Sequence, residues 1–461
     1  MRDPRYKPNI ILVNCDDLGY GDLECYGSEA HSTPHLNRMA EEGMLFTNFY
    51  QASSLCSPSR GAMLTGCYPI RIGFDSFDGM QVLIPGQGIG LNPTEVTFAT
   101  LLKDLGYATE IIGKWHCGDQ KEFLPTRHGF DNYYGLPYSN DMGRQFSQEL
   151  SPPLPLLRDE DVIEQQPDQA SLTERYLEEA IRFIRDSRQT PFLLYFAHMY
   201  VHLPLYVQER FERESRNGRY GAAVACIDWA MGVLMYEIKR MGIERNTLIL
   251  FTSDNGSRCD FGNSNGSLRG GKGTTWEGGQ RLPLIAWWPN QIPAGSLCDE
   301  IVTGMDFLPT FARLAGTTPP SDRIIDGRDM CPLLFCEPDT YSPHEVFFYY
   351  AADYLDAVRV GKWKLFVGRH GWEENENNIC ELYDLDTDIG ETNNLAAKYP
   401  QIVDRMMKQI VLCRDDIGDA MTRCPGENRR PIGRISNPRP LTDFDPNYPY
   451  YIAMYDLNEI G

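Results

Sequence analysis

The sequence predicts an α/β protein with a large, mostly parallel β-sheet flanked by helices and a smaller C-terminal domain with a short antiparallel sheet. Three observations predict this class. Continuous apolar runs, such as residues 9–13 and 192–197, have the composition of strands buried on both faces of a parallel sheet. Helical segments separate these runs, as in βαβ units. From about Tyr341 onward the pattern changes to short strand-like segments joined by turns.

The length of the chain, 461 residues, is sufficient for two domains with a large core. The change in pattern places the boundary near residue 338. We therefore expect a larger domain at residues 1–338 and a smaller one at residues 339–461, which ends in a tail wrapped on the surface. The sequence shows no internal repeats.

The chain is acidic, with 43 Lys and Arg against 64 Asp and Glu and a net charge of −21. This charge argues against binding to nucleic acid or to anionic membranes. No run approaches the roughly 18 apolar residues that span a bilayer. The polar start, residues 1–8, lacks the apolar core of a signal peptide, so a cytoplasmic location is expected. A secreted or periplasmic location applies if a leader has been removed.

Thirteen cysteines are scattered without a paired framework. This pattern favours free thiols in a reducing compartment, although pairs such as Cys331 with Cys336 stay open. No spacing resembles a zinc site.

Two adjacent carboxylates, Asp16 and Asp17, follow the first apolar run. They repel each other unless a cation lies beside them. A solvated turn is the alternative, but at the end of a buried strand we expect a metal site. Residues 33–43 then form a helix that ends at Gly43.

The segment after the strand at residues 44–50 offers a reactive position. Ser57 is a suitable N-cap and Pro58 suits the first helical position, so a helix should begin just after Cys56. Cys56 would then lie at the positive end of that helix, where an anion is favoured. Arg60 adds a fixed cation one turn later. A buried structural cysteine is the plain alternative.

The long irregular segment at residues 71–92 contains Asp75, Asp78 and Gln87, and we interpret it as a rim of the site. Lys114 and His116 follow the strand at residues 108–113, where ligand sites gather in parallel sheets.

The remaining elements continue the same alternation. Asp254 and Asn255 follow a further strand and add two more oxygen-bearing side chains. In the larger domain we expect helices at 95–105, 172–188 and 220–241, strands at 192–197, 247–252 and 283–288, a strand-turn-helix at 302–315 and a surface excursion at 143–169. In the smaller domain we expect antiparallel strands at 346–350, 357–360, 363–367 and 381–384, with a turn at Gly361-Lys362. A helix at 400–413 and a tail at 424–451 follow.

Six motifs in order resemble the type I, formylglycine-dependent sulfatases, in the branch of arylsulfatase A and N-acetylgalactosamine-6-sulfatase. The resemblance covers about the first 300 residues. The motifs are the Asp16-Asp17 pair, Cys56-Ser57-Pro58-Ser59-Arg60 with Leu64-Thr65-Gly66, Gly113-Lys114-Trp115-His116, the segment 129–141 with Gly135-Leu136-Pro137-Tyr138-Ser139 at its centre, Ser253-Asp254-Asn255-Gly256, and Gly271-Lys272-Gly273-Thr274 with Glu277-Gly278-Gly279.

The resemblance implies an alkaline-phosphatase-like sandwich and a site with two unusual groups. Cys56 would be oxidised to Cα-formylglycine by a formylglycine-generating or radical maturation enzyme. Asp16, Asp17, Asp254 and Asn255 would bind a divalent metal. An all-oxygen set selects Ca²⁺ or Mg²⁺, and the family more often shows calcium.

The resemblance also implies roles for the remaining residues. Arg60, Lys114 and Lys272 would bind the sulfate oxygens, with Ser139 as a further contact. His202, with Lys272, would protonate the leaving oxygen, and His116 would take the proton that releases sulfate. His198 would be a core residue. The expected substrate is a small sulfated sugar or an aryl sulfate.

Two alternatives remain from the sequence. One is a phosphonate or phosphate ester hydrolase of the same superfamily, and the other is an unmatured, non-catalytic binder of sulfated ligands. A tyrosine phosphatase loop does not fit, because its Cys and Arg are farther apart. A zinc alkaline phosphatase does not fit the positions of the eight histidines. The sequence does not predict an oligomeric state.

Overall fold

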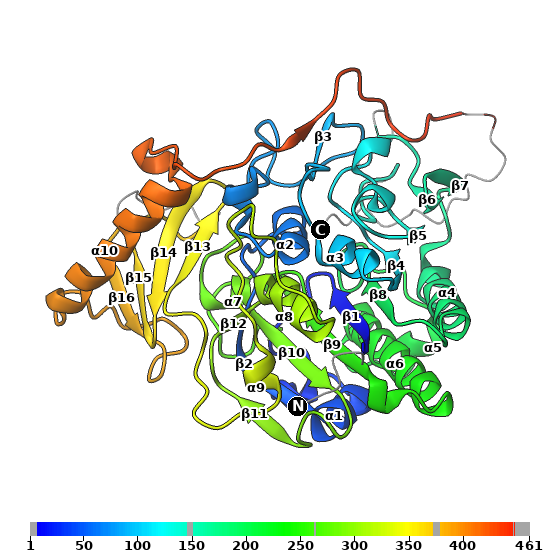
Figure 1. Ribbon diagram of the computed structural model, residues 1–461, viewed down its shortest axis with the longest axis horizontal. Coiled ribbons are helices and arrows are strands. Elements are labelled where there is room, and N and C mark those ends of the chain that lie inside the picture. The colour runs from blue at the N-terminus through cyan, green and yellow to red at the C-terminus, as the bar shows by residue number, and fades with distance from the viewer. Residues whose placement is uncertain (1–6, 145–150, 262–263, 372–378, 446, 448–461) are drawn as a thin grey trace.

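A computed structural model describes residues 7–144, 151–261, 264–371, 379–445 and 447 (Figure 1). One large mixed sheet crosses the molecule, and a small antiparallel sheet lies beside it, which confirms the predicted class. The large sheet has the order β11 (Ser296–Cys298), β2 (Met44–Tyr50), β10 (Arg281–Trp287), β9 (Thr247–Ser253), β1 (Asn9–Cys15), β8 (Phe192–Ala197), β4 (Ala108–Gly113), β5 (Asn132–Gly135), β6 (Pro155–Arg158) and β7 (Asp161–Gln165), with β12 (Val302–Thr303) also paired to β2.

The centre of the sheet is parallel, from β9 through β1, β8 and β4 to β5. All seven residues of β1 are buried, as its continuous apolar run predicts. The surface excursion expected at residues 143–169 is partly wrong, because β6 and β7 extend the sheet at this edge. Within that stretch, residues 145–150 lie outside the described residues.

Helices cover both faces of the sheet, and the side chains of β1 alternate between them. Ile10 and Leu12 belong to the core under α2 (Cys56–Thr65), α3 (Phe98–Asp104) and α8 (Phe307–Leu314). Ile11 and Val13 belong to the opposite core, under α1 (Pro34–Glu41), α4 (Leu172–Asp186) and α6 (Gly218–Arg240). Three further helices are short, α5 (Glu209–Glu212), α7 (Glu277–Gln280) and α9 (Cys331–Leu334).

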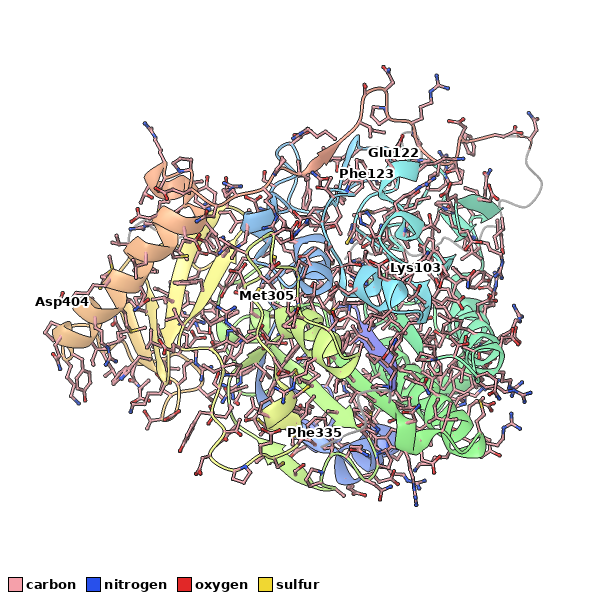
Figure 2. All side chains as sticks on the ribbon, viewed as in Figure 1. Lys103, Glu122, Phe123, Met305, Phe335 and Asp404 are labelled. Atoms are coloured by element: carbon pink, nitrogen blue, oxygen red, sulfur yellow. The ribbon has the colours of Figure 1, made fainter. Side chains whose placement is uncertain are left out.

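Figure 2 shows side chains filling the space between the helices and the sheet. Met305 and Phe123 are buried, whereas Lys103 and Asp404 are exposed at the surface. Closely packed cores therefore join the helices on each face to the strands of the sheets.

One helix is long and apolar enough to cross a membrane by length and composition, so the expectation that no segment reaches this limit was wrong. In α6, however, 72% of the most apolar 18-residue window is buried inside the protein. Its apolar character follows from packing against α1 and α4 beneath the sheet.

Two helix starts differ from the sequence prediction. Helix α2 begins at Cys56 itself, after an extended Leu55, and Ser57 is not its N-cap. The Ser57 Oγ instead accepts a hydrogen bond from the Leu83 N–H at 3.1 Å. Helix α3 begins at Phe98, because the Thr97 hydroxyl caps the Thr100 N–H.

The small sheet contains the four predicted strands, β13 (Phe347–Ala351), β14 (Tyr354–Val360), β15 (Trp363–Phe366) and β16 (Glu381–Asp384), with α10 (Pro400–Ile417) packed on it. Gly361 makes the predicted turn between β14 and β15 with a φ of 57°. The core of this sheet includes Tyr50 and Trp276 from the larger part of the chain. The domain boundary near residue 338 stays a prediction.

The tail lies along the rim segment at residues 71–92, as Figure 1 shows. Strand β17 (Gly433–Arg434) pairs with β3 (Ile89–Gly90). Three arginine–carboxylate pairs reinforce this contact, namely Arg429–Asp75 at 3.0 Å, Arg430–Glu95 at 2.7 Å and Arg434–Asp78 at 2.7 Å. The predicted tail is therefore ordered up to residue 445, and its residues 446 and 448–451 lie outside the described residues.

Residues 1–6 of the polar start also lie outside the described residues, and the cytoplasmic location expected from it stays a prediction. All thirteen cysteines are free in the structure, Cys331 and Cys336 included.

Candidate active site

The candidate site lies where the carboxyl ends of neighbouring parallel strands meet. Asp16 and Asp17 follow β1, Asp254 and Asn255 follow β9, and Lys114 follows β4. These strands lie next to one another around β8, and ligand sites in open α/β sheets form at this edge. The fold thus gathers residues that are more than 200 positions apart in the chain.

Backbone conformation at the strand ends is unusual. Asp17 and His116 have φ values of 60° and 57°, a region that few non-glycine residues adopt. Gly113 has a φ of 108°, and a Cβ there would lie 1.9 Å from the Ala197 carbonyl oxygen. A side chain at position 113 is therefore excluded, and the chain turns sharply just before Lys114. Such conformations concentrate at functional sites.

Three buried acids pair with three buried bases at this edge. Lys114 Nζ lies 2.6 Å from Asp16 Oδ2, and Lys272 Nζ lies 2.9 Å from Asp17 Oδ2. Arg60 Nε donates to Asp254 Oδ2 at 2.9 Å. We call these six residues the site cluster. Their formal charges sum to zero, which permits burial of so many ionic groups.

Burial and the charges of the site cluster shift the pKa values of its own carboxyl groups. Burial opposes ionisation of Asp16, but Lys114, His202 and Arg60 outweigh it and hold the pKa of this carboxyl well below its usual range. Burial raises the pKa of Asp254 to about 7 despite the nearby Arg60. Perturbed carboxyls in one place are typical of functional sites.

The donor set fits a hard divalent cation. Among the described residues, Asp16, Asp17 and Cys56 form the group whose potential ligand atoms lie within 4.8 Å of one another. Asn255 Nδ2 donates to Asp17 Oδ1 at 2.7 Å, so its oxygen adjoins the same group. Asp16 Oδ1 and Asn255 Oδ1 are buried and accept no hydrogen bond from the described residues. Buried acceptor oxygens without a hydrogen-bond donor are the atoms that a cation would bind.

Cys56 lies at the first position of α2 and lines a cavity of about 370 Å³. Burial raises the pKa of its thiol far above the usual range, outweighing Lys114 and Lys272. The helix terminus therefore does not make a thiolate here, and the unmodified thiol would be a poor nucleophile. The other residues at this end of the cavity are His116, Ser139, His202 and Lys272.

The two histidines present different nitrogens. His116 Nε2 lies 2.9 Å from the Leu83 carbonyl oxygen, so it carries the proton, and Nδ1 is left as a buried acceptor without a partner among the described residues. His202 Nδ1 lies 2.6 Å from the Leu203 carbonyl oxygen, which leaves Nε2 for proton exchange. Burial, aided by Lys114 or Lys272, lowers the pKa of both imidazoles.

His198 is a core residue, as expected. It is buried and its Nδ1 accepts the Tyr200 N–H at 3.0 Å.

The rim prediction is correct in its segment but not in the residues singled out. Residues 79–82 line the cavity, whereas Asp75 and Asp78 face the tail arginines, and Gln87 bonds within its own loop. Leu55, Asp141 and Met142 also line the cavity and were not predicted. Their only sequence signal is that each lies close in the chain to Cys56 or Ser139.

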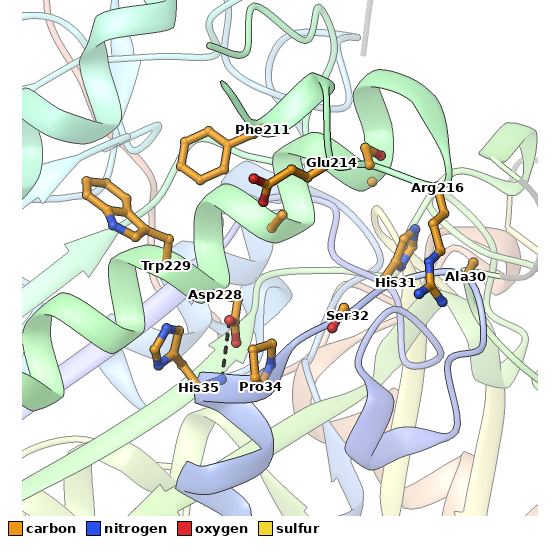
Figure 3. A pocket seen from close by; sticks show the side chains of 13 residues that line it. Ala30, His31, Ser32, Pro34, His35, Phe211, Glu214, Arg216, Asp228 and Trp229 are labelled. Carbon is orange, nitrogen blue, oxygen red and sulfur yellow. Dashed lines mark hydrogen bonds between the residues drawn. The ribbon is translucent and has the colours of Figure 1, made fainter. Parts of the chain in front are cut away.

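A second cavity, of about 290 Å³, lies between α1, α6 and the segment around Phe211 (Figure 3). It contains His35, Trp229 and Asp228, and Asp228 accepts the His35 backbone N–H at 3.3 Å. Asp228 also accepts the Leu36 N–H at 2.8 Å and thereby caps α1. Its carboxylate is thus engaged in the fold, and none of the site cluster lines this cavity.

Comparison with known families gives two matches. The sulfatase family model matches residues 8–317, which contain every residue of the site cluster. A model described as the C-terminal part of N-sulphoglucosamine sulphohydrolase matches residues 271–416.

The chain belongs to the sulfatase family.

Individual relatives support this assignment over most of the chain. N-acetylgalactosamine-6-sulfatase of Rattus norvegicus is 42% identical over 392 residues, covering 81% of this chain and 74% of the relative. Arylsulfatase A of Homo sapiens is 37% identical over 469 residues, covering 92% and 90%. Both lie in the branch that the motifs indicated.

A solved structure shows the same architecture. The crystal structure of Ps i-CgsB in complex with k-i-k-neocarrahexaose superposes with a TM-score of 0.77 at 30% identity, covering 88% of this chain and 92% of that chain. As a member of the family, the protein is a sulfuric ester hydrolase, and the sulfatase prediction is supported over the phosphonate hydrolase and binder alternatives. The roles of the individual site residues stay predictions.

Proposed function

We propose that this sulfatase hydrolyses the sulfate monoester of a small sugar or an aryl alcohol at the cavity above Cys56. The observation that carries the proposal is the convergence of Cys56, Lys272 and the two histidines on one cavity. Lys272 also belongs to the charge-balanced site cluster, in which Asp16 keeps an unused acceptor oxygen.

The residues Asp16, Asp17, Asp254 and Asn255 would hold the metal, with Ca²⁺ as the expected ion and Mg²⁺ as the alternative. When bound, such an ion supplies positive charge that lowers the pKa of an attacking hydroxyl and offsets negative charge on the sulfate. Support for this set is the all-oxygen chemistry and the two unpartnered oxygens, on Asp16 and Asn255.

Cys56 would be converted to formylglycine by a maturation enzyme. Its hydrate supplies one hydroxyl for attack and a second that allows sulfate to be expelled, which a serine could not provide. The buried, neutral thiol supports this proposal, because the unmodified residue lacks a reactive form.

The cations would bind the sulfate group. Lys114 and Lys272 each donate to one carboxylate oxygen among the described residues, which leaves further N–H donors on each ammonium group. Positive groups fixed in a dry site stabilise charge that develops in the transition state. The Ser139 hydroxyl is buried, has no partner among the described residues and lines the same cavity.

The histidine geometry supports opposite proton roles. His116 is neutral with Nδ1 unprotonated, which suits the base that removes a proton. His202 would deliver a proton to the leaving oxygen from Nε2. Burial, and after it Lys272, lowers the pKa of His202 in the free enzyme, and a bound sulfate anion would offset the effect of Lys272 and favour the protonated form.

The decisive experiment has two parts. Mass spectrometry of the peptide that contains Cys56 should show a loss of about 18 mass units, as expected when a thiol is replaced by an aldehyde. Sulfate release from 4-nitrophenyl sulfate and from N-acetylgalactosamine 6-sulfate is then measured before and after treatment with a chelator. We expect turnover that the chelator abolishes and Ca²⁺ or Mg²⁺ restores.

The outcome separates the candidates. The proposal would be contradicted by a converted enzyme that hydrolyses phosphate or phosphonate esters but releases sulfate from neither of the two sulfated substrates. A thiol that persists after co-expression with a maturation enzyme, together with binding of sulfated ligands, would identify a non-catalytic binder.

A further inference from the structure

We propose that this site selects sulfate esters whose alcohol part is uncharged, so that the substrate carries one sulfate and no neighbouring anion. The inference rests on the proposed function and narrows its substrate class. It comes from the charges that surround the leaving-group end of the cavity.

The positive groups at the cavity are those that the proposed function assigns to the sulfate, and each pairs with a carboxylate. Lys272 is the only Lys or Arg among the described residues that line the cavity, and it pairs with Asp17. Arg60 and Lys114 lie deeper and pair with Asp254 and Asp16. These cations match one sulfate and leave none for a second anion.

We call the lining residues outside the proposed sulfate-binding and proton-transfer groups the leaving-group wall. Its side chains are mostly apolar and include no Lys or Arg among the described residues, namely Leu55, Met80, Gln81, Val82, Asp141 and Met142. Apolar surface suits an aryl ring or the carbon face of a sugar. A second sulfate or a uronate at this wall would lose part of its hydration, and no basic side chain of the wall would replace it.

The arginines near the rim are not among the described residues that line the cavity. Arg434 pairs with Asp78 at 2.7 Å. The guanidinium carbon of Arg144, two residues after Met142, lies 3.8 Å from the centre of the Phe444 ring. Apart from residues 1–6, the segments outside the described ranges contain no Lys or Arg at all.

The whole-chain charge acts in the same direction. A net charge of −21 repels a polyanion at a distance, and recognition of several sulfates ordinarily requires clustered arginines. A substrate with one sulfate feels this repulsion least.

The test uses matured, Ca²⁺-loaded enzyme and two aryl sulfates, 4-(carbamoylmethyl)phenyl sulfate and 4-(carboxymethyl)phenyl sulfate, in which the methylene group keeps the two phenols similar as leaving groups. We expect kcat/KM to be about ten- to thirtyfold lower for the carboxylate, because the wall offers its charge no cation. The ratio should shrink as salt is raised. Galactose 6-sulfate against galactose 2,6-disulfate repeats the comparison on a sugar.

Variants of Met80 supply a gain-of-function arm. Met80→Lys should raise kcat/KM for the anionic member of each pair about tenfold relative to the neutral one, whereas Met80→Gln, similar in length but uncharged, should leave the ratio as in the wild type. Equal turnover of both members by the wild type at low salt would overturn the inference. Absence of sulfate release from all four compounds would instead overturn the proposed function.

Discussion

Two buried charge clusters in this protein are built from the same residue types and differ in how completely the protein satisfies them. The site cluster contains three acids and three bases at the strand ends. A second group, which we call the Glu277 cluster, joins the two sheets and contains Glu277, Glu391, Lys364, Arg359 and Tyr349. Its two acids and Lys364 are completely buried.

Lys364 shows the difference most clearly. Its Nζ donates to Thr275 O at 2.8 Å and to Glu277 Oε1 at 3.1 Å, and it lies 2.8 Å from Glu391 Oε1 as an ion pair without a hydrogen bond. Two of the three ammonium donors are thus used by the protein, and a second carboxylate lies in contact. Lys114 and Lys272 each have a single carboxylate partner among the described residues. The lysine of the Glu277 cluster is therefore enclosed by the protein, whereas those of the site cluster keep more donors for a ligand.

The Glu277 cluster also helps to position Lys272. The glycine-rich loop that carries Lys272 continues to Thr275 and Glu277, and Lys364 donates hydrogen bonds to both of these residues. Trp276 in the same loop stacks on His370 at 4.0 Å between ring centres. The small sheet therefore fixes one side of the active-site loop.

Removal of the nucleophile should give the largest effect. We expect Cys56→Ala to lower kcat by about 10⁴-fold or more, since the loss of a covalent nucleophile removes the reaction route. Folding should change little, because a small side chain replaces a buried neutral thiol. Sulfate release and thermal unfolding of the same preparation measure the two effects, and Cys336→Ala, at an exposed cysteine, is the control. Retained activity in Cys56→Ala would exclude Cys56 as the nucleophile.

An active-site lysine should matter for rate. We expect Lys272→Met to lower kcat by about 10²- to 10³-fold, the usual cost of one transition-state donor. With Ca²⁺ present, the cation offsets the charge of Asp17, so the unfolding midpoint should stay close to the wild type. Without Ca²⁺, Asp17 loses its partner and the variant should be less stable. A stability loss that Ca²⁺ does not relieve would place Lys272 with the structural cluster instead.

The enclosed lysine should matter for stability. We expect Lys364→Met to lower the free energy of unfolding by about 3–5 kcal/mol with or without Ca²⁺, because it removes a donor from Glu277 and leaves the buried Glu391 without a basic partner. Denaturant unfolding measures it. The matched control is Lys362→Met. Lys362 is partly exposed and solvent screens its pair with Asp384, so the loss of stability should be much smaller. Equal losses in both variants would remove the distinction between the clusters.

The sequence predicted the site cluster far better than the Glu277 cluster, for a physical reason. Asp16, Lys114 and Asp254 each directly follow a recognisable buried strand, and parallel strands bring their ends together. Lys364 and Glu391 are single charges in polar surroundings, and nothing local indicates that they meet Glu277 across more than 80 residues. The wall residues Leu55 and Met142 were missed likewise, because an isolated apolar residue carries no signal of its position.

The two carboxylates that share Lys364 give the smallest and most specific test. Burial raises the pKa of Glu391 to about 7, whereas Lys364 and Arg359 outweigh burial at Glu277 and lower its pKa to about 2. A raised pKa means that Glu391 is protonated in the folded state over a range in which the unfolded chain has lost the proton. Its contribution is thus complete below about pH 4.5 and is lost as the pH rises to about 7, at up to about 1.4 kcal/mol per pH unit.

Glu391→Gln removes this titration while keeping the size of the side chain. The stability of the wild type relative to Glu391→Gln should therefore fall between pH 4.5 and 7 and level off above, as measured by denaturant unfolding across that range. Glu277→Gln should behave oppositely, since a depressed pKa gives stability that is present above about pH 4.5 and lost toward pH 2. A flat difference for Glu391→Gln would mean that both acids are ionised around Lys364. The number of protein groups around the lysine, rather than charge balance, would then be what distinguishes this cluster from the active site.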